Sequence, residues 1–342
     1  MTRITIADVA LAAGVGLSTV DRVMNGRRPV RPETAARVLD AAERIGFYGS
    51  AVIRQQIEAL SRPLTFDFIL LQRAAQFYRL LGDALIRAAQ TCTEASVHAK
   101  LHYLDDVTPR AMAAQLTGLI RKSDGVAIVA SDHNLVSQAI ADLAGHGTPT
   151  VAIITDLTAP RRRAYVGHDF WKIGRTAGWS IAHLATGPGK VGVVIGSHRY
   201  LSQDAMEIGF RSYFREKAPG FQVLEPLQNL ETASLGYEAT LELLVRHPDM
   251  RGLYLAGGGQ EGVIQALREF DRPERLVTVC MALTDTSAEA LRDDVIQVVL
   301  DHPCRPLAEA VLAALIQAVR RPDEAGLIQT LLPFEIVTSE NL

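Results

Sequence analysis

The sequence predicts an α/β protein in which a small three-helix segment is followed by two doubly wound parallel-sheet lobes. Its 342 residues exceed the roughly 100 to 200 residues of a usual single domain. The first 46 residues show helical periodicity with clear start and stop signals, whereas short apolar runs alternate with helical patterns from residue 64 onward. We therefore expect one helical N-terminal domain and a larger body.

Composition places the chain among globular proteins that bury a sizeable core. It is 48% hydrophobic and 21% charged, which argues against global disorder. The longest apolar runs are shorter than the 18 or so residues of a membrane helix, and the start of the chain lacks the apolar region of a signal peptide. We expect a cytoplasmic protein without a membrane partner. Cys92, Cys280 and Cys304 form no C-x-x-C pair, so neither a disulfide framework nor a zinc ribbon is expected.

The N-terminal segment predicts three short helices. Thr5 is placed to cap the first, with Asp8 three residues later, and Gly14 ends it. The second is expected over 17–24, with its valines inward and its polar residues outward. The third begins near Pro32 and stops at Gly46. Two short helices joined by a glycine-containing turn, with a third in support, form a helix-turn-helix.

Charge and side-chain size favour DNA as the partner of this segment. Residues 1–62 hold nine arginines and six acidic residues, a net charge of +3 that leaves −6 for the rest of the chain. Short polar side chains on the second helix allow close approach to base edges in the major groove. A helical hairpin that merely packs on the body is the alternative, and a basic cluster weighs against it: Arg22, Arg27, Arg28 and Arg31.

The body predicts parallel sheets covered by helices on both faces, because its apolar strands are nearly continuous. These strands are expected at 66–71, 125–129, 150–154, 190–195, 252–255 and 276–281. Ligands of such folds bind outside the carboxyl ends of the strands. The polar and aromatic side chains that follow strands, a mixture suited to a hydroxyl-rich ligand, are Gln72, Arg73, Phe77, Tyr78, Ser131, Asp132, Asp156, Gln260, Glu261 and Asp301.

A glycine motif offers an alternative, an NAD-dependent enzyme with an incidental basic N-terminus. Residues 257–262 fit G-x-G-x-x-G after a strand and before a helix, but the acidic residue expected about 20 positions later is replaced by Met281 and Ala282. His98 and His102 lack the glutamate of a zinc protease motif, and no nucleophile elbow is found. We expect no catalytic residues, no cofactor and no metal, and thus no enzyme.

The N-terminal run from Thr5 to Phe47 resembles the headpiece of lac-repressor-type (LacI family) transcriptional regulators. It keeps the pattern T-I-x-D-V-A, S-T-V-x-R-V, P-E-T and A-A of that family, although Gly16 and Asp21 stand where serines are usual. The resemblance implies that Leu17, Ser18 and Arg22 face base edges. It also implies phosphate contacts by Thr5, Thr19, Asn25 and Thr34.

The family carries a hinge helix after its headpiece, which corresponds to residues 47–62 of this chain. Arg54 stands at a matching basic position, and the position of the leucine that wedges into the minor groove falls on Gln56. Because a glutamine cannot unstack a base step as an apolar wedge does, the kink is in question. Ile53 or Ile57 could substitute, and a plain linker helix is the alternative.

The body is similar to the effector-binding core of the same regulators, and thus to periplasmic sugar-binding proteins (periplasmic binding protein type I). The similarity implies one lobe from 63–169 and 302–331 and another from 170–301 and 332–342. Phe77 and Tyr78 match an aromatic pair of the family, and Asp169 matches its aspartate. Met206 and Ala282 replace a frequent arginine and a frequent carboxylate, which indicates a ligand without an anionic group.

These observations predict a DNA-binding regulator, with repression as the expected action on carbohydrate-utilisation genes. We expect a homodimer on a palindromic operator, since one helix-turn-helix covers one half-site. A small neutral sugar, which could be a disaccharide stacked on Phe77, Tyr78 and Trp171, is expected between the lobes as the allosteric effector.

Overall fold

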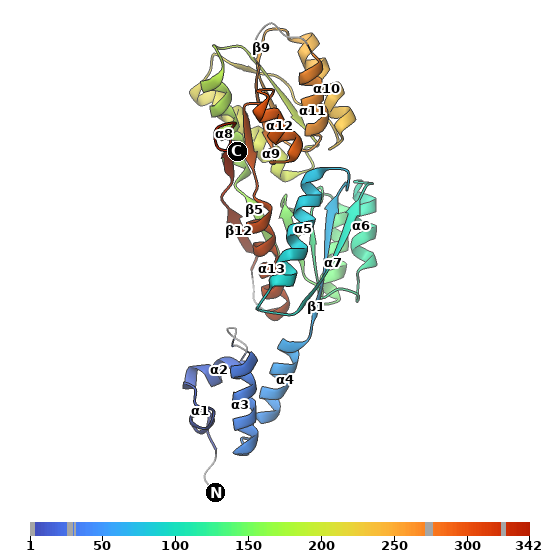
Figure 1. Cartoon of the computed structure of the whole chain (residues 1–342). Coiled ribbons are helices and arrows are strands. Elements are labelled where there is room, and N and C mark those ends of the chain that lie inside the picture. The colour runs from blue at the N-terminus through green and yellow to red at the C-terminus, as the bar shows by residue number, and fades with distance from the viewer. Residues whose placement is uncertain (1–3, 26–29, 31, 271–275, 323–325) are drawn as a thin grey trace. The chain divides into compact units, whose positions relative to one another are not determined.

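The structure is a computed structural model of the whole chain (Figure 1). It describes residues 4–25, 30, 32–270, 276–322 and 326–342, apart from the side chains at 32, 56 and 58–61. The chain forms two compact units. One runs to Leu64 and includes Ala89–His98, and the other comprises Thr65–Ala88 and Ala99–Leu342.

The N-terminal unit contains the helices α1 (Ile6–Ala13), α2 (Leu17–Asn25), α3 (Pro32–Arg44) and α4 (Ser50–Ser61). Gly14 ends α1 in the left-handed conformation at φ 62°, as a helix-stopping glycine should. Val9, Val20 and Val38 bring one apolar face of each of the first three helices into a shared core. The predicted three-helix headpiece is confirmed.

Helix α4 belongs to the same core. Ile53 is fully buried there beside Phe47, and Ile57 packs against it from the next turn. Ile53 is therefore not exposed for insertion into the minor groove in this structure, and which residue acts as the wedge on DNA stays a prediction. Gln56, the expected wedge position, has a side chain outside the described residues.

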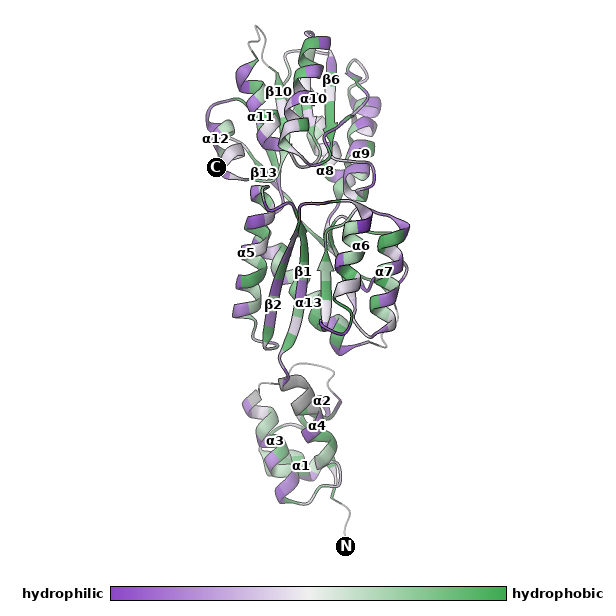
Figure 2. Cartoon of the chain, turned by 90° about the vertical axis from the view of Figure 1, so that its right-hand side faces the viewer, coloured by the Kyte–Doolittle hydropathy of each residue, from purple (hydrophilic) through white to green (hydrophobic). Residues whose placement is uncertain are grey.

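The first lobe of the larger unit is a six-stranded sheet in the order β12-β5-β4-β3-β1-β2. The strands from β1 through β3, β4 and β5 to β12 pair in parallel. Buried apolar side chains dominate the central strands, whereas the edge strand β2 is only partly buried and mixes hydrophobic with hydrophilic residues (Figure 2). The strands are β1 (Leu64–Leu71), β2 (Val97–Leu104), β3 (Gly125–Ile128), β4 (Thr150–Ile154), β5 (Ala164–His168) and β12 (Ile328–Leu332).

Helices cover this sheet. Their buried faces follow helical spacing, as Val136, Ile140 and Leu143 of α7 illustrate. Helix α13 packs on the strands β3, β4 and β5 although it comes late in the chain. The helices of this lobe are α5 (Gln76–Thr91), α6 (Pro109–Gly118), α7 (Asn134–Gly145) and α13 (Cys304–Arg320).

The second lobe is a seven-stranded sheet in the order β13-β11-β10-β9-β6-β7, with β8 also paired to β6. Among the described residues its strands pair in parallel, except that β11 and β13 are antiparallel. The strands are β6 (Lys190–Ile195), β7 (Gln222–Val223), β8 (Leu227–Gln228), β9 (Met250–Leu255), β10 (Val277–Met281), β11 (Val298–Asp301) and β13 (Glu335–Val337). The helices are α8 (Phe170–Leu184), α9 (Leu201–Lys217), α10 (Ala233–Arg246), α11 (Gln260–Glu269) and α12 (Asp285–Arg292).

The chain passes between the lobes after β5, after β11 and after β12. Both sheets are therefore built from segments on either side of a crossover. The predicted architecture, a helical headpiece with two doubly wound lobes, is confirmed. No helix among the described residues is long and apolar enough to cross a membrane.

Candidate functional site

Helix α2 presents a polar, solvent-exposed face. Val20 and Val23 turn inward, so Ser18 and Arg22 point away from the headpiece core and lie exposed. Leu17 at the start of the helix is 56% exposed, so its apolar side chain lies on the same solvent-facing surface. Such a face, one apolar contact among short polar groups and an arginine, suits reading of base edges.

The residues expected at phosphates are held by local contacts. Thr5 and Asp8 form a capping box, in which the Thr5 amide and hydroxyl donate to the Asp8 carboxylate at 2.8 Å and lower the pKa of Asp8. Asn25 donates to Asp21 at 2.7 Å, and Arg54 pairs with Glu43 at 2.6 Å.

The structure describes only some of the other residues expected on the DNA surface. Thr19 and Thr34 are half-buried. Arg27, Arg28 and Arg31 of the basic cluster lie outside the described residues, so their relation to α2 stays a prediction.

A cavity of about 70 Å³ opens between the two lobes, at the carboxyl ends of their strands. Both lobes contribute to its wall, as expected for a doubly wound fold. We call it the interlobe cavity, and its lining residues are Ala75, Phe77, Tyr78, Ile154, Phe170, Ser202, Gln203, Met206, Glu231, Ala256, Gly257, Gly258, Gly259, Gln260, Glu261, Met281, Ala282 and His302.

Backbone strain concentrates at this cavity. Ile154 at the end of β4 has φ 65°, Glu231 after β8 has φ 65°, and Ala282 after β10 has φ 64°. Residues with side chains adopt the left-handed region at a cost, and such strain clusters at binding sites in proteins. At these positive φ angles the chain turns sharply away from the strand ends and forms the cavity wall.

A buried carboxylate lies in the wall contributed by the second lobe. Glu231 is 7% exposed and accepts from Gln203 Nε2 at 2.7 Å and from the Gly258 amide at 3.2 Å. Burial raises the pKa of Glu231, while these two hydrogen bonds oppose the rise. The Gln203 Oε1 atom accepts from the amides of Gly196 and Ser197 at 2.7 and 3.0 Å, which fixes the amide that faces Glu231.

The glycine motif serves this carboxylate and the packing of the helices. A Cβ at Gly258 would lie 2.6 Å from Glu231 Oε2, and one at Gly262 would come within van der Waals overlap of the Ala233 carbonyl on α10. The close approaches that require glycine here are thus explained inside the chain, without a pyrophosphate. The dinucleotide alternative is not favoured.

Rings line the crossover side of the cavity. His302, directly after β11, stacks on His168 with ring centroids 5.2 Å apart and meets the edges of Phe77 and Phe170. His168 in turn approaches the Leu332 carbonyl within 3.0 Å, so it touches all three crossovers. Burial, with a smaller contribution from His168, lowers the pKa of His302 to about 3. His302 is therefore neutral in cellular conditions.

Of the predicted effector residues, Phe77, Tyr78, Gln260 and Glu261 line the cavity. Tyr78 is nearly buried, and burial raises its pKa well above the usual range. In the orientation that pairs both of its amide atoms, Gln260 donates to the Met281 carbonyl and accepts from the Thr284 hydroxyl, each at 2.9 Å. Met206 and Ala282, noted as departures from the family pattern, lie in the wall as well.

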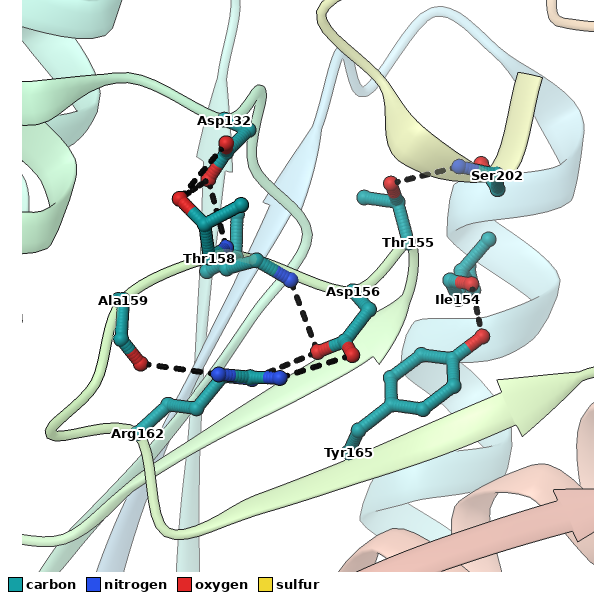
Figure 3. A network of polar contacts seen from close by, with 10 residues as sticks. Asp132, Ile154, Thr155, Asp156, Thr158, Ala159, Arg162, Tyr165 and Ser202 are labelled. Atoms are coloured by element: carbon teal, nitrogen blue, oxygen red, sulfur yellow. Dashed lines mark hydrogen bonds and ion pairs between the residues drawn. The ribbon is translucent and has the colours of Figure 1, made fainter. Parts of the chain in front are cut away.

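Asp132 and Asp156 lie in a polar network outside the cavity wall (Figure 3). Asp156 holds Arg162 through two bonds of 2.7 and 3.0 Å, and Asp132 accepts from the Thr158 amide and hydroxyl. These carboxylates fix the loop between β4 and β5. The structure does not bring them to the cavity.

The remaining predicted residues also have other partners. Asp169 caps α8 through the Lys172 amide at 3.1 Å, and Asp301 accepts from the Leu283 amide at 2.7 Å. Trp171 is 42% exposed and lies 4.9 Å from the Arg175 guanidinium. The Arg73 guanidinium lies over the Tyr103 ring, and Gln72 is half-buried before α5. None of these five side chains lines the cavity.

Hydrogen bonds join the lobes beside the cavity. Gln76 Nε2 donates to Asp285 Oδ2 at 2.5 Å, and the Asp285 amide donates back to Gln76 Oε1 at 3.1 Å. Elsewhere the Asp132 amide donates to the Arg199 carbonyl at 2.7 Å, and the Ser202 amide donates to the Thr155 hydroxyl at 3.2 Å (Figure 3). The lobes are thus in direct contact in this structure.

Sequence reasoning missed Glu231, Gln203 and His302. Glu231 follows β8, a strand of only two residues, which is too short to show as an apolar run. The rule that ligand-binding residues follow the carboxyl ends of strands selects Asp301 and not the adjacent His302. For Gln203, which sits in the first turn of α9, no signal in the sequence marks it apart from other polar helix residues.

Two family profiles match the chain. Residues 5–50 match "Bacterial regulatory proteins, lacI family", and residues 67–322 match "Periplasmic binding protein domain". Catabolite control protein A of Priestia megaterium is 47% identical over 51 residues, or 15% of each chain. The maltose regulon regulatory protein MalI of Escherichia coli is 38% identical over 90 residues, 26% of this chain and 25% of that protein. These matches span a quarter or less of the relatives' length.

Solved structures resemble the larger part of the chain. A solute-binding protein from Agrobacterium vitis bound with α-D-tagatopyranose has a TM-score of 0.73 at 18% identity, covering 81% of this chain and 95% of that one. One from Actinobacillus succinogenes with bound D-allose has a TM-score of 0.73 at 13% identity, covering 82% and 99%. At these identities the likeness concerns the fold.

Proposed function

Because the chain belongs to the family of periplasmic binding protein domains and carries a lacI-family DNA-binding domain before it, we propose that it is a ligand-controlled transcriptional regulator. In this proposal the exposed face of α2 reads operator DNA and a small ligand in the interlobe cavity sets the affinity for that DNA. Repression of carbohydrate-utilisation genes is the expected mode of action, and the chain performs no catalysis of its own.

The observation that carries the proposal is the pairing of two sites of different chemistry in one chain. Ser18 and Arg22 stand exposed on α2 with Leu17 beside them, and the wall of the cavity holds a buried carboxylate among rings. A DNA-reading surface and a ligand cavity in a two-lobed fold are what an allosteric regulator needs. Coupling between two such sites is typically about 1 to 3 kcal/mol.

A neutral carbohydrate is the effector class that the cavity supports. No lysine or arginine occurs among its described lining residues, which leaves a phosphate or carboxylate without a counter-charge. Phe77, Tyr78 and Phe170 offer ring surfaces to the C–H faces of a sugar, and Glu231 offers an acceptor to its hydroxyls. D-Allose and D-tagatose, which the structural neighbours hold, are suitable first candidates.

We further propose a homodimer on a palindromic operator in the cytoplasm. One α2 helix covers one half-site, so two-fold symmetry doubles the base contacts and the affinity gained from phosphates. Arg22 is the residue expected to contribute most to base discrimination, with Leu17 and Ser18 beside it and Thr5, Thr19, Asn25, Thr34 and Arg54 toward the backbone.

A gel-shift titration on DNA upstream of the gene and its neighbours tests the proposal. The wild-type protein should give a sequence-specific band at physiological salt, and Arg22→Ala should lose about 1 to 3 kcal/mol of operator binding together with base discrimination. Arg305→Ala is the matched control, because Arg305 is exposed on α13. Equal preference of wild type for operator and scrambled DNA would refute the regulator proposal.

A further inference from the structure

We propose that Glu231 determines which effectors the interlobe cavity accepts: its carboxylate accepts a hydrogen bond from a hydroxyl or ammonium group of the ligand and excludes ligands that carry a phosphate or carboxylate. This inference rests on the proposed function, since it concerns the same cavity. It goes beyond the proposed function by naming the residue that determines ligand specificity and the ligand charge that the cavity excludes.

The first step is that Glu231 is buried without a counter-ion. It is 7% exposed, and the ion pairs among the described residues include none that involves it. Its hydrogen-bond donors, the Gln203 amide and the Gly258 amide, are neutral. Taking a carboxylate out of water without a cation is costly, so a purely structural role would be better served by a glutamine.

The second step is that the surrounding backbone is shaped to fit this carboxylate. A Cβ at Gly196 would overlap Glu231 Oε1, and one at Gly257 would lie 2.9 Å from the same oxygen. Leu230 and Glu231 take consecutive positive φ values of 48° and 65° to deliver the side chain. The glycines at the ends of the two neighbouring strands leave room for the carboxylate, and the strained turn holds it at the cavity wall.

The third step is that the carboxylate keeps unused capacity to accept. Oε1 receives the short bond from Gln203 and shares the Gly258 amide, whereas Oε2 receives only that amide, at 3.2 Å. An ionised carboxylate offers about four acceptor positions. A ligand that enters the cavity can therefore donate to Oε2 without displacing Gln203, and a hydrogen bond to a charged acceptor is stronger than one between neutral groups.

The fourth step concerns the other charged and titratable groups around Glu231. Tyr78 from α5 and Tyr200 before α9 feel its charge, but their pKa values are raised first by burial, so both stay neutral hydroxyls. Glu261 of α11 lines the same cavity and adds negative charge, and His302 is neutral. An anionic ligand would meet repulsion from both carboxylates without compensation by a cation of the described wall.

The test uses the full-length protein and matched sugars in three charge classes. The neutral arm contains D-allose, D-tagatose and D-galactose, the ammonium arm D-galactosamine, and the anionic arm D-galacturonate and D-galactose 6-phosphate. A rise in melting temperature identifies binders, and calorimetric titration gives Kd for each in wild type, Glu231→Gln and Glu225→Gln. Glu225 is an exposed carboxylate of the same lobe and serves as the control.

We expect binders only in the neutral or ammonium arm, and at least a tenfold loss of affinity in Glu231→Gln with none in Glu225→Gln. Comparison of those two arms tells whether the donor is a hydroxyl or an ammonium. Because burial raises the pKa of Glu231, wild-type affinity should also fall on acidification at a higher pH than an ordinary glutamate would give, and Glu231→Gln should remove this dependence.

A binder from the anionic arm, or a Glu231→Gln variant with wild-type Kd, would overturn the inference while leaving the regulator proposal intact. A panel without any binder would overturn the carbohydrate chemistry on which the inference depends. Failure of the regulator proposal shows separately, as loss of operator discrimination in the gel shift, which does not require the ligand.

Discussion

The contact between Gln76 and Asp285 makes effector binding sensitive to a change outside the cavity wall. Gln76 lies at the start of α5 in the first lobe and Asp285 at the start of α12 in the second. Their two hydrogen bonds, of 2.5 and 3.1 Å, join the two lobes in this structure. If the effector binds between closed lobes, removal of these bonds weakens effector binding.

The magnitude follows from which atoms each substitution removes. Asp285→Ala deletes one acceptor but keeps the backbone amide that donates to Gln76, so one bond is lost. Gln76→Ala deletes both bonds. A hydrogen bond contributes about 0.5 to 1.5 kcal/mol, and solvent exposure favours the lower half of that range. We therefore expect Kd to rise about 2- to 5-fold in Asp285→Ala and about 5- to 30-fold in Gln76→Ala.

Calorimetric titration of the bound sugar into each variant measures the effect. Gln265→Ala is the control, because Gln265 donates to Glu269 within the same helix α11 at 2.9 Å and spans no lobe boundary. The graded order wild type, Asp285→Ala, Gln76→Ala is the signature of closure. Equal Kd in Gln76→Ala and Gln265→Ala would refute the view that these bonds stabilise the lobe arrangement that binds the effector.

Two further predictions concern the stability of each unit. Ile53→Ala removes a fully buried side chain that joins α4 to the headpiece, so we expect headpiece stability to fall by about 2 to 5 kcal/mol and operator binding to weaken. Hydrogen exchange of α1 to α3 measures the stability, and a gel shift measures the operator binding. Wild-type protection from exchange in the variant would contradict the packing of α4. Burial raises the pKa of Glu231 in the folded state above its value in the unfolded chain. The protonated side chain therefore contributes folding stability that is fully present below the unfolded-state pKa and is lost as the pH rises through the folded-state pKa. The free energy of unfolding in urea is measured for wild type and Glu231→Gln at several pH values. Between the two pKa values of Glu231 the wild type should lose stability relative to the variant as the pH rises. The same pH dependence in both proteins would contradict the burial of the carboxylate.

The fold could be predicted from the sequence because its signals are local. Thr5, Asp8 and Gly14 mark the first helix by capping chemistry, and each of these signals appears in the structure as expected. The central strands of both sheets are nearly continuous apolar runs. They are visible in the sequence because both faces of each strand are buried.

The cavity could be predicted only in part, because proximity to a strand end does not fix where a side chain points. Asp156 follows β4 and satisfies the strand-exit rule, but Arg162 six residues later pairs with it and turns it toward the loop. Glu231 could not be found in this way, since β8 is two residues long. Its position depends on glycines more than 25 residues away, Gly257 and Gly258, and such packing is not encoded in a local pattern.

Reciprocal titration of operator and sugar tests the central claim, that one ligand in the interlobe cavity controls the affinity of α2 for DNA. Operator Kd is measured by fluorescence anisotropy with and without saturating sugar, and sugar Kd by calorimetry with and without saturating operator. We expect operator Kd to change by about 5- to 150-fold when sugar is bound, and linkage requires the same factor in the sugar Kd. Sugar binding that leaves operator Kd unchanged within about twofold would contradict the central claim.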